Sequence, residues 1–255
     1  NLDLGTAAID ATTPDTPALN ITSDGTLTVG PIGQSTQVES VDIQVNDGDD
    51  RITLGGSIDS ANAVEITVTD DSLATKIHLG SDVDVTAGDA NITFGNIADA
   101  NAHNLGAHAG TGNVTVGTIA NGADVDIDGA DITLGEVGSV ATSFAASVDI
   151  DGTDITINDA ITATDGISAV ASNDVNSNGA LTSSGSSIEL IAAGAIDVGG
   201  DVTNSSGEVV ISGNTDADAD DEDVTISANL DAGGDVVVTV QGAAGDIIID
   251  AAQDN

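Results

Sequence analysis

The sequence predicts an all-β protein, a right-handed parallel β-helix (β-solenoid) built from coils of roughly 20 residues. Three observations predict this fold: short segments that alternate apolar and polar residues, turn-forming residues between them, and a composition almost free of aromatic side chains. The chain has 255 residues with 2 Phe and no Trp, Tyr, Met or Cys. Because aromatic and Met side chains normally fill irregular gaps in a core, this core must be regular enough for Val, Ile, Leu and Ala.

Two strand-like motifs recur along residues 27–158. The first is an aliphatic residue, Thr or His, a second apolar residue and usually Gly, and its copies begin at Leu27, Ile52, Ile77, Ile92, Val114, Ile132 and Ile155. The second places an acid between aliphatic residues and occurs at Val41–Val45, Val64–Val68, Val83–Val85, Val125–Ile127 and Val148–Ile150. A period of two is typical of strands with one buried face. Copies of the first motif lie roughly 20 residues apart, which predicts one coil per copy.

The same alternation continues after residue 185, with Gly, Asn and Asp between the apolar segments. No window shows the apolar spacing of an amphipathic helix. A β-sandwich is the alternative for a chain of many short strands, but a sandwich uses longer strands, an aromatic-rich core and a different sequence for each strand. Nearly interchangeable strands with aliphatic residues alone favour the solenoid, in which identical positions of successive coils stack in ladders.

Three regions depart from this rhythm. Residues 1–19 contain a Pro/Thr-rich stretch and are interpreted as an extended arm or linker, ahead of a single solenoid over residues 20–255. Residues 98–112 interrupt the repeat and are interpreted as a surface loop. Residues 165–187 are rich in Ser, Asn and Gly, and they mark the place where the solenoid would divide into two halves.

The charge of the chain excludes two classes of partner. There are 43 acidic residues, 37 of them Asp, against only two permanent cations, Arg51 and Lys76, so the formal net charge is −41. Such a chain offers no positive surface for nucleic acid or for an anionic membrane. No apolar run is long enough to cross a bilayer, so membrane insertion is not expected. The lack of Cys excludes disulfides and thiolate chemistry.

The second half of the sequence resembles a known family. Residues Ile188–Ser212 and Asn229–Val240 look like the repeats of filamentous-haemagglutinin-type β-helical adhesins, and the resemblance covers residues 180–255 best. It implies a secreted or surface-displayed shaft of the bacterial kind. Residues 20–160 resemble these repeats only in their general pattern.

The acidic side chains predict a need for counterions. Carboxylates that alternate with core residues point outward, and stacked coils would bring them about 5 Å apart, where two charges repel by about 0.8 kcal/mol in water. We therefore expect stabilisation by Ca²⁺ or by salt. Two segments are the candidate Ca²⁺ sites, the alternative for both being solvated acidic turns. Residues 46–50 resemble the turns of calcium-binding β-roll repeats, which carry Gly and Asp ahead of a strand. Residues 216–223 space their carboxylates as a calcium loop does at its first, third and fifth positions. Their ligands would be Asp47, Asp49 and Asp50 in the first segment and Asp216, Asp218, Asp220, Asp221 and Asp223 in the second.

No catalytic or organic-cofactor site is expected. The chain lacks a nucleophile elbow, a phosphate-binding loop and a dinucleotide fingerprint, and its many Asp residues make any chosen carboxylate pair uninformative. His78 stands at a strand position otherwise held by Thr, and we interpret it as an outward polar residue. His103 and His108 fall in the 98–112 segment, where a solvated role is expected and metal ligation is the alternative.

These observations lead to a functional hypothesis. We expect an extracellular or cell-surface structural protein, a β-solenoid subunit or shaft segment of a fibre or adhesin that associates head to tail and is stabilised by cations. The first alternative is an adhesin module that binds a glycan or a cell-surface ligand through residues 98–112. A more remote alternative is a β-helical enzyme that acts on polysaccharides.

Overall fold

A computed structural model describes residues 2–5, 7–13, 17–46, 51–68, 77–99, 102–120, 122–135, 137, 145–216, 222–241 and 245–250. It confirms the predicted all-β parallel β-solenoid, with about 10 turns and coils of ~22 residues. The described residues contain no helix. The chain forms two compact units, unit 1 from Asn1–Ala130 with Val140–Ser143, and unit 2 from Asp131–Ser139 with Phe144–Asn255.

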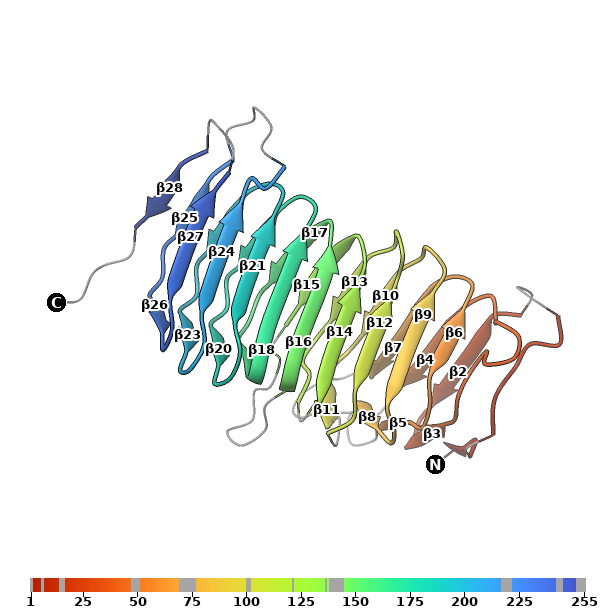
Figure 1. The fold of residues 1–255 in the computed structure, drawn as a ribbon. Helices are drawn as coiled ribbons and strands as arrows, with labels where there is room; N and C mark the ends of the chain where they lie inside the picture. The colour runs from red at the N-terminus through yellow and green to blue at the C-terminus, as the bar shows by residue number, and fades with distance from the viewer. Residues whose placement is uncertain are drawn as a thin grey trace. The chain divides into compact units, whose positions relative to one another are not determined.

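Unit 1 has three columns of parallel strands (Figure 1). The first column is β1 (Leu2–Asp3), β3 (Leu27–Val29), β5 (Ile52–Leu54), β8 (Ile77–Leu79) and β11 (Ile97–Asp99). The second is β2 (Leu19–Ser23), β4 (Val41–Val45), β7 (Val64–Val68), β10 (Ile92–Phe94) and β13 (Val114–Val116). The third is β6 (Ile58–Ser60), β9 (Val83–Ala87), β12 (Leu105–His108) and β14 (Asp124–Asp128).

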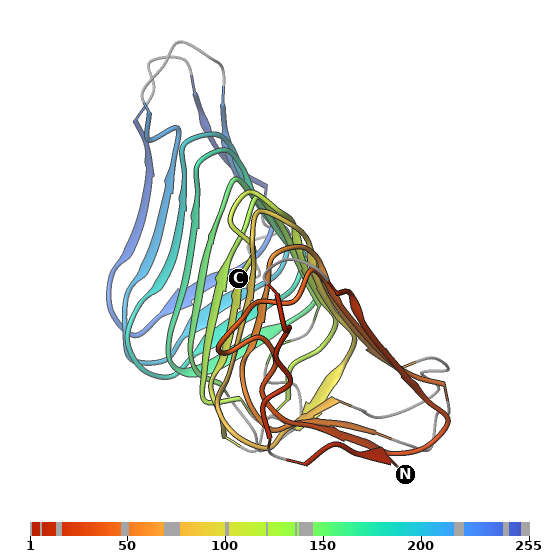
Figure 2. The ribbon, with the colours of Figure 1, turned by 90° about the vertical axis from the view of Figure 1, so that its right-hand side faces the viewer.

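Unit 2 also stacks its strands in parallel columns, and Figure 2 shows its coils, drawn from green to blue, following one another around a common path. One column is β15 (Asp131–Leu134), β17 (Asp154–Ile157), β19 (Val175–Ser177), β22 (Ile196–Val198), β25 (Val224–Ile226) and β28 (Ile247–Ile249). Another is β16 (Ala145–Gly152), β18 (Ile161–Ala171), β21 (Ile188–Ala192), β24 (Val209–Gly213) and β27 (Val236–Val240). The first residues of β18 also begin a third column, β20 (Leu181–Ser183), β23 (Val202–Asn204) and β26 (Leu230–Ala232).

The core consists of stacked aliphatic side chains, as the composition predicts. Ile92 lies in register with Val64 on one side and Val114 on the other, and all three are buried. Phe94 occupies the same kind of position between Ile66 and Val116. Because strands from successive coils share one register, an inward residue of an interior coil is covered by its counterparts in the coils before and after it.

Two segments are more regular than the sequence indicates. In the 98–112 segment, β12 places Leu105 and Ala107 in the core, so the interpretation of this segment as a surface loop is wrong. Its Gly and His at outward positions weaken the alternation that marks a strand. In the segment interpreted as an arm, β1 pairs with β3 and Ile9 bridges to Ile32. Residues 165–187 form the end of β18, β19, β20 and their turns; a division of the solenoid there stays a prediction.

Short polar side chains connect successive coils at the positions just before or at the start of strands. At each such position the side-chain oxygen of an Asp or Asn accepts a hydrogen bond from a backbone N–H of the next coil, and we call this pattern the Asx ladder. In unit 2, Asp174 accepts from Ala195 at 2.8 Å and Asp201 accepts from Asn229 at 3.0 Å. Because the short Asx side chain brings its oxygen to this N–H, the geometry favours Asp or Asn over the longer Glu at these positions.

Candidate cation-binding groove

The best-defined polar site lies on the outward face of β9, β12 and β14 in unit 1, which run side by side (Figure 1). On β12, Leu105 and Ala107 point inward, so Gly106 and His108 are the outward residues. The register places Gly106 between Asp84 of β9 and Asp126 of β14. It also places His108 beside Asp128. Carboxylates from two different coils therefore flank one imidazole.

Both ring nitrogens of His108 contact carboxylates. Nδ1 is 2.6 Å from Oδ2 of Asp128, and Nε2 is 3.2 Å from Oδ1 of Asp84. The side chain of His108 is 30% exposed, against 61% for Asp84 and 46% for Asp128. A neutral imidazole donates a hydrogen bond from only one of its nitrogens, whereas an imidazolium donates from both. The ring is thus fixed between two coils, and in its neutral form one nitrogen carries a lone pair.

Gly106 makes room for this arrangement. A Cβ at this position would lie 2.9 Å from Oδ1 of Asp84 and 2.9 Å from Nε2 of His108. Any side chain here would therefore push the carboxylate and the ring apart. Because Gly106 has no side chain, the Asp84 carboxylate and the His108 ring can approach each other over its backbone.

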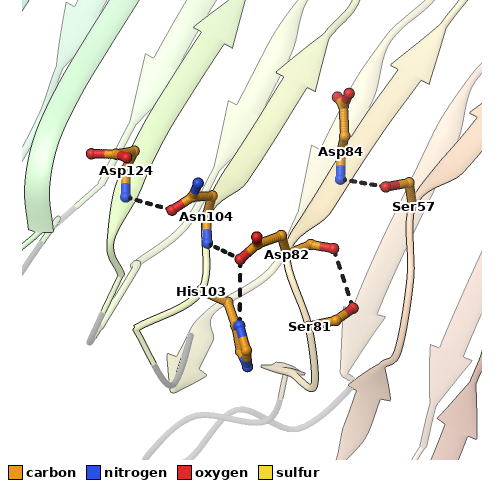
Figure 3. A network of polar contacts seen from close by, with 7 residues as sticks. All are labelled: Ser57, Ser81, Asp82, Asp84, His103, Asn104 and Asp124. Atoms are coloured by element: carbon orange, nitrogen blue, oxygen red, sulfur yellow. Dashed lines mark hydrogen bonds and ion pairs between the residues drawn. The ribbon is translucent and has the colours of Figure 1, made fainter.

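A groove of about 320 Å³ runs over these strands, and its polar lining comes from Ser57, Asp82, Asp84, Asn104, His108, Asp124 and Asp126. At one side, Asn104 links two acids through the Asx ladder, since its N–H donates to Asp82 at 3.0 Å and its amide oxygen accepts from the N–H of Asp124 at 3.2 Å (Figure 3). His103 also contacts Asp82, with 3.4 Å between Nδ1 and Oδ1. The groove is therefore acidic and rich in oxygen atoms.

A set of atoms suited to a cation lies at the groove, where His108 and Asp126 line it and Asp128 adjoins them. A ring nitrogen of His108 and one carboxylate oxygen each from Asp126 and Asp128 lie within 4.8 Å of one another. Imidazole nitrogen together with carboxylate oxygen is the ligand combination of Zn²⁺ and related divalent ions, whereas Ca²⁺ and Mg²⁺ prefer oxygen alone.

This cluster does not follow from the sequence pattern alone. His108 was expected to be solvated, with metal ligation as the alternative, and its partners are 18 and 20 residues further along. Such partners meet only when the coil length and the strand register are known. The one available signal was the match between this separation and the coil repeat.

Most of the predicted Ca²⁺ ligands cannot be placed. Asp47, Asp49, Asp50, Asp218, Asp220 and Asp221 lie outside the described residues. The other two, Asp216 and Asp223, belong to the connection between β24 and β25. Asp216 is exposed. Asp223 is part of the Asx ladder and accepts the N–H of Asp246 at 2.8 Å. Calcium binding at these two segments stays a prediction.

The outward acids are spaced differently from the expected continuous rows. Within the registers described for each unit, direct acid–acid neighbours occur at Asp42–Glu65 and Asp131–Asp154. Elsewhere a neutral or basic residue intervenes: Gly106 separates Asp84 from Asp126, and Ser168 separates Asp149 from Glu189. Two coil spacings rather than one reduce the repulsion of such a pair in water from about 0.8 to about 0.4 kcal/mol. In rows where another residue separates the acids, the repulsion between carboxylates is therefore weaker than the sequence predicts.

Comparison with known proteins adds no family to this description. No protein-family model matches the chain, and searches of curated proteins and of solved structures found no match. In the part of the chain that the structure describes, no helix has the length and apolar character needed to span a membrane.

Proposed function

We propose that this chain is a structural segment of an extracellular fibre or adhesin shaft, in which coils of one copy continue onto coils of the next. The haemagglutinin-like repeats of residues 180–255 support this proposal, as do the acidic surface and the absence of any recognisable catalytic motif. We propose no enzymatic role. The partners would be further copies of the chain and a glycan or cell-surface ligand, with neither nucleic acid nor membrane insertion involved.

One observation carries the proposal: the inward row of the last described coil is exposed. Val236 is 45% exposed, whereas Val209, its neighbour in register on β24, is 0% exposed. Ile247 and Ile249 of β28 are 45% and 60% exposed, although Val224 and Ile226 beneath them are 0% and 1% exposed. These aliphatic residues occupy core positions, and no further coil covers them among the residues that the structure describes.

The occupant that fits this surface is another coil of the same kind, which a longer chain or a second copy would supply, and we propose the second copy. Among the described residues, β27 pairs only with β24, and β28 only with β25, so each has an edge open to a further parallel strand. In unit 1, β3 is the one described strand that pairs with β1, and Leu2 of β1 is 40% exposed. Complete burial of an aliphatic side chain contributes about 1.5–3 kcal/mol, so these half-exposed residues would add on the order of 1 kcal/mol each. Such a contact is heterologous and propagates into a filament.

Cations have a defined part in this proposal. A formal net charge of −41 on every copy opposes association, and the opposition falls with ionic strength or with bound divalent ions. We therefore expect Ca²⁺ to promote assembly, either at the acidic segments around Asp47 and Asp216 or as a diffuse counterion.

The experiment is electron microscopy and sedimentation of the purified chain with chelator and with Ca²⁺, using two matched variants. Val236→Asp places a charge on the exposed inward row, whereas Val237→Asp places the same charge at a similarly exposed outward position of the same strand. We expect filaments from the wild type and from Val237→Asp, and isolated particles from Val236→Asp. A wild-type chain that stays monomeric at high concentration in Ca²⁺ would overturn the head-to-tail proposal.

A second candidate function, glycan binding, is favoured by the groove. Ser57, Asn104 and several carboxylates line it, and these groups form hydrogen bonds with sugar hydroxyls. Screening the chain against a glycan array tests this alternative. Binding that is lost in Asn104→Ala would support an adhesin module, while the absence of any bound glycan would remove it.

A further inference from the structure

We propose that His108, Asp126 and Asp128 bind a divalent transition-metal ion of the Zn²⁺ class, with Asp84 holding the imidazole in position. This site is separate from the predicted Ca²⁺ segments, and it does not depend on filament formation. The three proposed ligands come from β12 and β14 of unit 1. Their ligand atoms lie within 4.8 Å of one another before any ion draws them closer.

The nitrogen ligand decides the class of ion. Carboxylates alone would favour Ca²⁺ or Mg²⁺, and this chain has many carboxylates. An imidazole between two coils favours Zn²⁺, Ni²⁺, Co²⁺ or Cu²⁺ instead. Among the histidines of the chain, His108 is the one that lies with two acids in such a group of described residues.

Asp84 supplies the outer contact that a metal-binding histidine normally has. Its Oδ1 lies 3.2 Å from Nε2 of His108, so it can accept the Nε2–H hydrogen bond. Acceptance there leaves the lone pair on Nδ1, the nitrogen that is 2.6 Å from Oδ2 of Asp128. A metal ion between Nδ1 and Asp128 would accept this lone pair and a carboxylate oxygen, and so relieve the repulsion between two groups that both lack a proton in this tautomer. Carboxylates on the far nitrogen of a ligating histidine fix its tautomer and raise its basicity.

Gly106 is the independent observation that supports the site. It lies between Asp84 and Asp126 in the register, and a Cβ there would come within 2.9 Å of both the Asp84 carboxylate and the ring of His108. The strand therefore carries its smallest residue where the proposed ligands and their support converge. The adjoining groove of about 320 Å³ gives the ion a path from solvent and room for water ligands.

The test is a titration of the full chain with zinc chloride, in a large excess of Ca²⁺ that occupies the general acidic surface. Two-dimensional NMR of the imidazole groups suits the chain because it has 3 His. We expect one equivalent of Zn²⁺ to shift the ring signals of His108 and leave those of His78 and His103 unchanged. Calorimetry under the same conditions gives the affinity.

The decisive variants are His108→Gln and His103→Gln. Both histidines are partly exposed and contact carboxylates, but only His108 belongs to the group of three. We expect His108→Gln to weaken Zn²⁺ binding at least tenfold and His103→Gln to leave it within twofold. Gly106→Ala and Asp84→Ala should each weaken binding, the latter by about 10–100-fold, as is usual for outer-shell partners.

Circular dichroism establishes that each variant keeps the strand content of the wild type. Equal binding by His108→Gln and the wild type would overturn the proposal, as would complete displacement of Zn²⁺ by Ca²⁺ or an equal response from all three histidines. None of these results bears on filament formation, so the failure of this site is distinguishable from the failure of the shaft proposal.

Discussion

Two strands of unit 2, β24 and β27, have similar apolar sequences and different environments. In β24, Val209 and Ile211 are 0% exposed because β21 lies on one side and β27 on the other. In β27, the equivalent Val236 is 45% exposed because β24 is its one neighbouring strand in the described part of the chain. Burial in this fold is thus a property of the neighbouring coils and not of the residue, so stability should accumulate from coil-to-coil contacts.

The largest effect should come from a cavity in an interior coil. Leu190 of β21 is fully buried between β18 and β24, and Leu190→Ala should lower the free energy of unfolding by about 2–5 kcal/mol. Val236→Ala, at the exposed inward row, should cost less than about 1 kcal/mol because little area is lost from the folded state. Urea unfolding followed by circular dichroism measures both. Equal losses would show that the last coil is covered in solution.

The second-largest loss of stability should come from a position where the backbones of two coils approach closely. A Cβ at Gly200 would lie 2.2 Å from the carbonyl oxygen of Gly179, so Gly200→Ala must push two coils apart and should cost roughly 1–3 kcal/mol. Gly199 is the matched control because its Cβ would meet nothing nearer than 3.6 Å. Gly199→Ala should change stability by no more than about 0.5 kcal/mol. Thermal melts compare the two variants directly. Similar melting temperatures would contradict the close approach of Gly200 to the Gly179 carbonyl.

The Asx ladder should show the same contrast between an interior coil and the last described coil, with a smaller loss of stability. Asp174 accepts the N–H of Ala195 at 2.8 Å, so Asp174→Ala should lose about 1 kcal/mol and Asp174→Asn should recover most of it. Asp246 donates its own N–H to Asp223 but lies in the last described coil. Asp246→Ala should therefore be nearly neutral. Hydrogen exchange at the Ala195 amide reports the lost bond, and unchanged protection in Asp174→Ala would refute its role.

The smallest effect concerns pH. The backbone N–H of Ser35, 2.9 Å from Oδ1 of Asp10, lowers the pKa of Asp10 below its ordinary value. Because the folded-state pKa is the lower one, this contact stabilises the fold above the unfolded-state pKa, and the contribution is lost as pH falls through the folded-state pKa. Asp10→Asn should remove this small part of the acid sensitivity. An NMR titration of the Asp10 carboxyl that gives its ordinary pKa would contradict the assignment.

The sequence predicted the strands better than the site. Alternating segments such as Ile52–Leu54 and Val41–Val45 became strands as expected, because their pattern is local and repeats in each coil. β12 was missed because Gly106 and His108 conceal its alternation. The groove was missed because it depends on which residue of β9 or β14 faces His108, and that register is set by the lengths of the turns between strands.

The Asx ladder and the shared register also bear on how such a chain can change over generations. In unit 2, Ile161 is paired with Leu181, and Leu181 with Val202, through equivalent contacts. Loss of residues 181–201 would bring Val202 to the position of Leu181, against the same partner. Whole coils can therefore be deleted or duplicated without remaking the contacts on either side, whereas removal of one or two residues within a strand would shift every inward side chain. The coil is therefore the unit by which this protein can lengthen or shorten in evolution, because a change of one whole coil preserves the contacts between the remaining coils.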